Sequence, residues 1–129
     1  MRMIEAFAKM IAAIIGLREK GELDKARSLV EEAYKTVLKV NSGEIKEFDE
    51  KQWKQFCSQR SPEELEMLAD LLKVEGEIRI DSGQAEGICT LLHKALELLK
   101  LVEAQSGNFS LTRFNKISEL EQKLSGSEH

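Results

Sequence analysis

Apolar side chains recur at steps of three and four residues along most of this 129-residue chain, which is the spacing of one face of an α-helix. One such stretch spans residues 3–15, and a second spans residues 23–38, after Gly21. One proline and eight glycines also provide too few turn-forming residues for a sandwich of many strands. The pattern therefore predicts an all-α fold, in which Gly21 joins the first two helices into a hairpin.

The second half of the chain predicts another helical hairpin. Residues 61–64 (Ser-Pro-Glu-Glu) favour a helix start, because a serine cap, a proline at the first helical position and a glutamate three residues later act together. We expect this helix to continue to Asp81. Residues 78–80 alternate as a strand would, but so short a segment has no strand to pair with. Ser82 and Gly83 predict the turn, and a second helix is expected over residues 85–103.

Two further segments are expected to be helical. Residues 44–59 predict a short helix, which aromatic side chains would hold against the first hairpin: Phe48, Trp53 and Phe56. Residues 106–108 break the chain, and residues 109–124 predict a last amphipathic helix that caps the hairpins. The sequence therefore predicts five or six helices in a single domain of residues 1–125, followed by a polar tail of residues 126–129.

Charge and cysteine content limit the kinds of partner. The chain carries 19 basic and 23 acidic residues, a net charge of −4, whereas a nucleic-acid-binding protein usually has a surplus of lysine and arginine. Two cysteines without a secretory signature predict free thiols in a cytoplasmic protein. The longest apolar run is residues 10–15, and a membrane span needs about 18 to 20 residues. We therefore expect neither a nucleic-acid nor a membrane partner.

The two hairpins show an internal repeat. An offset of 62 residues places Gly21 on Gly83 and Ala33 on Ala95, and small residues suit positions where antiparallel helices cross closely. Together with Ala26, these spacings resemble the tetratricopeptide repeat. The whole chain resembles a family of small bacterial proteins of tetratricopeptide-like helices with no assigned activity, notably over residues 1–5, 21–26 and 93–96. The resemblance implies tetratricopeptide-like hairpins, a C-terminal capping helix and a role in protein–protein interaction.

Cys89 and His93 are the strongest candidates for chemistry, because side chains four residues apart on a helix share one face. A structural zinc site needs four ligands, and the other two would have to be Cys57 and His129. A Cys–His nucleophile pair would need a third group to orient the imidazole. We therefore expect no metal, no cofactor and no catalytic residue, and we expect Cys89 to be buried or half-buried.

The resemblance also implies an interaction groove lined by the first helix of each hairpin. Its inward-facing residues would be Ile11, Ile15, Arg18, Asp70, Lys73 and Glu77. Acidic residues flank Lys73, so a clamp for the terminal carboxylate of a peptide is not expected. Ile11 and Ile15 would alternatively be part of the core. The expected partner is a helix or short segment of another protein, or a second copy of this chain.

An alternative function is a small ligand-binding protein or enzyme with a pocket between the hairpins, near Trp53 and His93. A deep pocket that encloses His93 and an acidic neighbour would favour this alternative. A large exposed apolar patch on the first or last helix would favour the interaction module. The scarcity of histidine, cysteine and aromatic residues favours the non-catalytic module.

Overall fold

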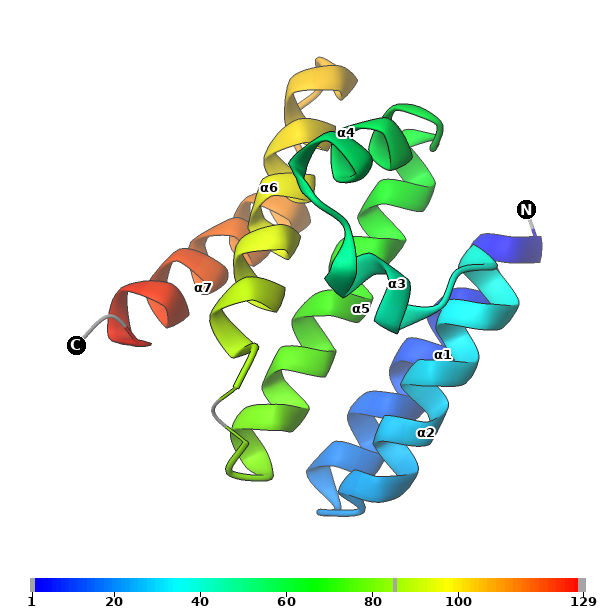
Figure 1. The fold of residues 1–129 in the computed structure, drawn as a ribbon, viewed down its shortest axis with the longest axis vertical. Helices are drawn as coiled ribbons and strands as arrows, with labels where there is room; N and C mark the ends of the chain where they lie inside the picture. The colour runs from blue at the N-terminus through cyan, green and yellow to red at the C-terminus, as the bar shows by residue number, and fades with distance from the viewer. Residues whose placement is uncertain (1, 85, 128–129) are drawn as a thin grey trace.

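The computed structural model describes residues 2–84 and 86–127, and every regular element in them is helical (Figure 1). The elements in chain order are α1 (Arg2–Glu19), α2 (Leu23–Ala33), the π-helix η1 (Tyr34–Leu38), α3 (Ser42–Glu47), α4 (Glu50–Ser58), α5 (Pro62–Asp81), α6 (Ile88–Ser106) and α7 (Leu111–Ser127). This part of the chain contains no strand, which confirms the predicted all-α class. None of these helices has the length and apolar character that a membrane span requires.

Helix α5 is the centre of the fold and stands between α6 and the pair formed by α1 and α2 (Figure 1). Arg113 of α7 contacts Glu66 near the start of α5, and Lys123 of α7 contacts Glu77 near its end, at 3.4 and 3.5 Å. α7 therefore runs parallel to α5. Figure 1 shows that α1 also runs in this direction, whereas α2 and α6 run in the opposite one.

Both predicted hairpin turns are confirmed. Gly21 and Gly83 have φ values of +77° and +76°, in the left-handed region that favours glycine. In each turn, the backbone N–H that follows the glycine donates to the carbonyl oxygen five residues earlier, at 2.9 Å. The α1–α2 and α5–α6 hairpins are therefore closed in the same way.

Helices α5 and α6 cross closely at Gly76. A Cβ atom at this position would lie 2.9 Å from Cδ2 of Leu92, which is fully buried. The three alanines of the predicted repeat are also fully buried: Ala26, Ala33 and Ala95. A larger side chain at Gly76 would force Leu92 to move, so the glycine permits the close approach of the two helices.

The start of α5 forms as its sequence predicts. The backbone N–H of Glu64 donates to Oγ of Ser61 at 3.2 Å, and the Glu64 carboxylate accepts the backbone N–H of Ser61 at 3.5 Å. Pro62 occupies the first helical position. The helix continues through residues 78–80 to Asp81, which confirms that this short alternating segment is helical.

Residues 44–59 do not form one helix. Asp49 starts a new helix, because its carboxylate accepts the backbone N–H of Gln52 at 2.7 Å while the Gln52 side chain accepts that of Asp49 at 2.9 Å. α3 and α4 are therefore separate, and the described residues form seven α-helices and one π-helix, more than the predicted five or six helices. Trp53 of α4 is buried, but its indole contacts Glu97 and Lys94 of α6, in the second hairpin, whereas the prediction places it against the first hairpin.

Helix α6 begins at Ile88, later than the predicted residue 85, which lies outside the described residues. Gly87 has a left-handed φ of +79°, and the Arg79 guanidinium donates to the carbonyl of Glu86 at 2.8 Å. These features keep the segment before Ile88 outside the helix. At the other end, α6 extends three residues beyond the predicted end and stops before Gly107, where φ is +69°.

Helix α7 continues to Ser127, beyond its predicted end at residue 124. Residues 126 and 127, which were predicted as part of the polar tail, are therefore helical. The rest of that tail, residues 128–129, lies outside the described residues, so His129 is not placed.

Cys89 is exposed, so the prediction that it would be buried or half-buried is wrong. The buried face of α6 is formed by Leu91, Leu92, Ala95, Leu98, Leu99 and Val102. Cys89 and His93 share one face of α6, as their spacing predicts, but this is the face turned toward water. Cys57, in contrast, is buried.

Candidate interaction groove

A groove of about 430 Å³ lies between α1 and the first half of α5. The wall formed by α1 consists only of apolar residues: Ile4, Phe7, Ala8, Ile11, Ala12 and Ile15. The wall formed by α5 is mainly acidic and consists of Glu63, Glu66, Met67 and Asp70. Ala8 and Ala12 are exposed, and their small side chains leave the space between the helices open.

Three of the six residues expected to line an interaction groove lie together in this one. Ile11, Ile15 and Asp70 all line it, so residues of α1 and α5 that are far apart in sequence share one surface. Ile15 is 41% exposed and is not a core residue. Ile11 is half-buried and also packs against the core.

The other three predicted groove residues form an ion cluster nearer the C-terminal ends of α1 and α5. Glu77 is only 6% exposed, and its carboxylate lies 3.5 Å from Arg18, 3.1 Å from Lys73 and 3.5 Å from Lys123. Arg18 also contacts Asp81 at 2.6 Å, and this hydrogen bond is the main reason that the pKa of Arg18 is raised. The cluster therefore joins α1 and α7 to α5, and its charged groups form ion pairs with other residues of the chain.

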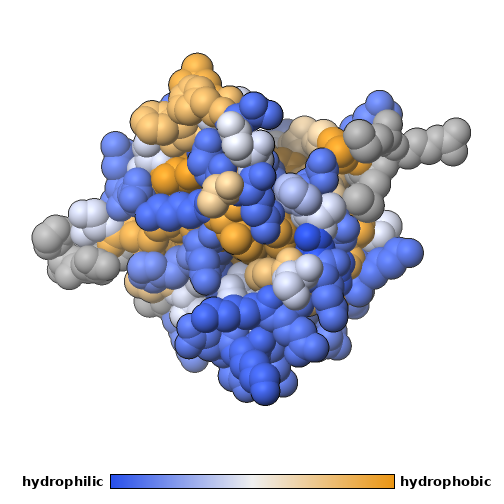
Figure 2. Space-filling model, turned by 90° about the horizontal axis from the view of Figure 1, so that it is seen from above, coloured by the Kyte–Doolittle hydropathy of each residue, from blue (hydrophilic) through white to orange (hydrophobic). Residues whose placement is uncertain are grey.

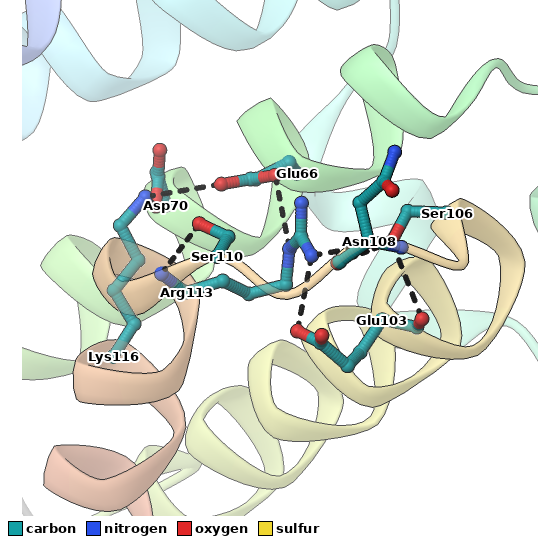
Figure 3. A network of polar contacts seen from close by, with 8 residues as sticks. All are labelled: Glu66, Asp70, Glu103, Ser106, Asn108, Ser110, Arg113 and Lys116. Carbon is teal, nitrogen blue, oxygen red and sulfur yellow. Dashed lines mark hydrogen bonds and ion pairs between the residues drawn. The ribbon is translucent and has the colours of Figure 1, made fainter.

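The acidic wall of the groove is held in place by α7 (Figure 3). Lys116 lies 2.9 Å from Asp70 and 3.5 Å from Glu66. Arg113 lies 3.4 Å from Glu66 and 3.0 Å from Glu103 of α6. Burial raises the pKa of Asp70, and Lys116 opposes this effect. The sequence spacing did not identify Glu63 and Glu66 as groove residues, although they precede Asp70 on the same helix.

Helix α7 buries its apolar face mainly in its second half. Leu120 and Leu124 are buried, whereas three large apolar side chains near its start are 71%, 63% and 52% exposed: Phe109, Leu111 and Phe114. The two phenylalanine rings contact each other, with centroids 5.9 Å apart. Figure 2 shows one edge of the molecule where hydrophobic residues protrude, opposite an edge that is mainly hydrophilic.

The sequence contains a signal for this exposed segment that the helical pattern does not capture. Residues 106–115 include one charged residue, Arg113, in a chain that is 33% charged. The Arg113 side chain is only 11% exposed, because it contacts Glu66, Glu103 and Ser106. The surface of this segment is therefore apolar or uncharged.

The pocket beside Trp53 does not include His93. It has a volume of about 320 Å³ and lies between α4 and α6. The Trp53 indole donates to Glu97 at 3.2 Å, and the Lys94 ammonium lies 4.3 Å from the centroid of the indole ring. Cys57 also lines this pocket, and burial raises its pKa to about 11. His93 is exposed and is absent from the lining, so the two residues of the alternative prediction do not share a pocket.

A third cavity, of about 230 Å³, lies among α2, α3 and α5 and is lined mainly by charged side chains. Its buried carboxylate, Glu75, accepts a hydrogen bond from the Tyr34 hydroxyl at 2.9 Å. Lys46 and Arg79 lie 2.7 and 3.3 Å from Glu75. Burial, followed by the charge of Glu75, raises the pKa of Tyr34 well above its usual value. These contacts join α3 to α5 and the end of the first hairpin.

Within residues 2–84 and 86–127, no three or more histidine, cysteine, aspartate or glutamate side chains are grouped so that they could hold a metal ion. Comparisons of the chain with models of protein families, with curated proteins and with solved structures gave no match. The interpretation of the groove therefore depends on its own residues.

Proposed function

We propose that the protein is a non-catalytic interaction module that binds an apolar helix or short segment of a partner in the groove between α1 and α5. The groove itself is the observation that supports this function. Six apolar residues of α1 line the groove, and three of them, Ala8, Ala12 and Ile15, are exposed on the surface of a chain that is 33% charged. Covering such a wall removes apolar surface from water and favours association.

The order of the helices supports a tetratricopeptide-like interpretation. α1 and α5 are the first helices of two hairpins with equivalent turns, and they run parallel with α7. In that interpretation the first helices form the binding surface, and α7 caps the second hairpin. α3 and α4 are then an insertion between the two hairpins, which accounts for the offset of 62 residues.

Two neighbouring alanines of α1 provide a matched test. Ala12 lines the groove, Ala13 does not, and both are exposed. An arginine favours a helix almost as well as alanine does, so both Ala12→Arg and Ala13→Arg should fold. We expect a synthetic amphipathic helical peptide with a leucine-rich face to bind the unaltered chain. Ala12→Arg should weaken this binding at least tenfold and Ala13→Arg less than twofold, as measured by fluorescence anisotropy.

Binding that Ala12→Arg leaves unchanged, or no binding at all, would contradict the proposed function. Light scattering on the same proteins tests whether the partner is a second copy of the chain. If the unaltered chain associates and only Ala12→Arg is monomeric, the groove binds another copy, and the module is homotypic.

A further inference from the structure

The two walls of the α1–α5 groove differ in charge. All six lining residues of α1 are apolar, whereas three of the four lining residues of α5 are acidic: Glu63, Glu66 and Asp70. These three carboxylates stand at intervals of three and four residues, and so they share one face of α5. A segment lying in the groove would therefore meet apolar side chains on one flank and carboxylates on the other.

The carboxylates near this wall outnumber the cations. Glu103 of α6 joins the three groove carboxylates, while Arg113 and Lys116 of α7 supply two positive charges (Figure 3). Among these six residues, four negative and two positive charges leave a charge of −2. The charge of Lys73 also acts on Asp70, but Lys73 forms ion pairs with Glu77 and Glu119. Glu63 is exposed and forms no ion pair with the described residues. The acidic wall therefore keeps an excess of negative charge on the side that faces the groove.

The two cations cannot turn to Glu63 without leaving their present partners. The Arg113 side chain is 11% exposed and bonds Glu103, Glu66 and Ser106. Lys116 lies 2.9 Å from Asp70 and is 25% exposed. No lysine or arginine is among the described residues that line the groove. A cation that a bound partner places near Glu63 and Glu66 would experience favourable electrostatic attraction at this partly buried wall.

We propose that the groove selects a cationic amphipathic helix, with its apolar face against α1 and lysines or arginines along the flank that meets α5. This inference rests on the proposed function and names the chemistry of the partner. Ile4 to Ile15 is a stretch of 12 residues of α1, and its 11 steps of helical rise give a straight wall of about 16 Å. A partner helix of three turns matches this length, and it can present apolar and basic residues on adjacent faces.

Two synthetic peptides with the same leucine-rich face test the proposal, one with lysines and the other with glutamates along the flanking positions. We expect the lysine peptide to bind the unaltered chain at least tenfold more tightly at about 50 mM salt, with the preference shrinking as salt increases. Glu63→Lys should reduce this preference at least fivefold.

Glu44→Lys is the matched control, because Glu44 is also an exposed glutamate in the first turn of a helix. Both substitutions change the net charge by the same amount and place a lysine in the first turn of a helix, but Glu44 lies outside the groove. Glu44→Lys should leave the peptide preference within twofold of its original value. Circular dichroism should show the same helix content in both variants.

Equal binding of the two peptides would overturn the cationic partner but leave the proposed function intact. An equal effect of Glu44→Lys and Glu63→Lys would also overturn it, since net charge alone would then explain the preference. Occupation of the groove by a second copy would overturn it as well. Failure of both peptides to bind would instead reject the proposed function and this inference together.

Discussion

The two sides of α5 are built differently. Toward α6, α5 presents Gly76, and the helices approach so closely that a single added Cβ would lie 2.9 Å from a buried leucine side chain. Toward α1 and α7, the same helix presents charged residues that form ion pairs with those neighbours: Glu66, Asp70, Lys73, Glu77 and Asp81. The first side leaves no space between helices, whereas the second leaves the groove of about 430 Å³.

This difference shows how one helix supports both the fold and the candidate site. Apolar contacts with α6 fix α5 by close packing, which tolerates little change in side-chain volume. On the other side, ion pairs hold α1 and α7 at specific points, so a gap can remain between those points. The groove lies where α1 presents apolar residues and α5 presents mainly carboxylates. Nearer the C-terminal ends of these helices, the ion pairs of Glu77 join α1 to α5.

The largest loss of stability is expected when the ion pairs of Glu77 on the charged side of α5 are removed. Glu77→Ala removes the buried carboxylate that Arg18, Lys73 and Lys123 share. We expect a loss of about 2–3 kcal/mol of unfolding free energy, because three partly buried cations lose their common partner. Urea denaturation measures this loss.

Glu119→Ala is the control, because Glu119 also contacts Lys73 and Lys123 but its side chain is 49% exposed. We expect this variant to lose less than about 1 kcal/mol. Equal losses in the two variants would show that the burial of Glu77 does not strengthen its ion pairs.

A substitution at Ala95 tests the close packing between α5 and α6. Ala95 is fully buried on the inward face of α6. Ala95→Leu should overpack this face and destabilise the fold by about 1–3 kcal/mol, and Ala33→Leu should act similarly in the first hairpin. Ala104→Leu, at an exposed position of α6, should have almost no effect. Thermal melting that is unchanged by Ala95→Leu and Ala33→Leu would contradict the close crossings that the repeat predicts.

The smallest effect on stability is expected at Asp70, a residue on the charged side of α5 that also lines the groove. Burial holds the folded-state pKa of Asp70 above its value in the unfolded chain, so ionisation of Asp70 disfavours folding. The unaltered chain should therefore lose stability relative to Asp70→Asn as pH rises from about 3 to about 6. Urea denaturation of both proteins at several pH values measures the difference. A change in the opposite direction would mean that Lys116 outweighs burial.

Local sequence signals predicted much of the fold, because caps and turns depend on neighbouring residues. Ser61, Pro62, Gly21 and Gly83 place their helix ends correctly. The start of α4 was missed although its signal is also local, since Asp49 and the residue three positions later form a capping box. The apolar spacing alone extends a helix through this point.

The candidate site was predicted less completely, because it depends on which helices meet. The structure brings Ile11, Ile15 and Asp70 together in one groove and places Arg18, Lys73 and Glu77 in an ion cluster beside it. The burial of Glu77 could not be predicted, since its three cations come from α1, α5 and α7. The exposure of Cys89 could not be predicted either, because helical spacing groups residues on a face without showing which face is exposed to water.

The contrast between the two cysteines makes the protein easy to label at one place. Cys57 is buried with its pKa raised to about 11, so little of it is thiolate near neutral pH, whereas Cys89 is exposed. A maleimide fluorophore should therefore attach to Cys89 alone without mutagenesis. Because α5 separates α6 from α1, such a dye would report on the molecule without filling the groove (Figure 1).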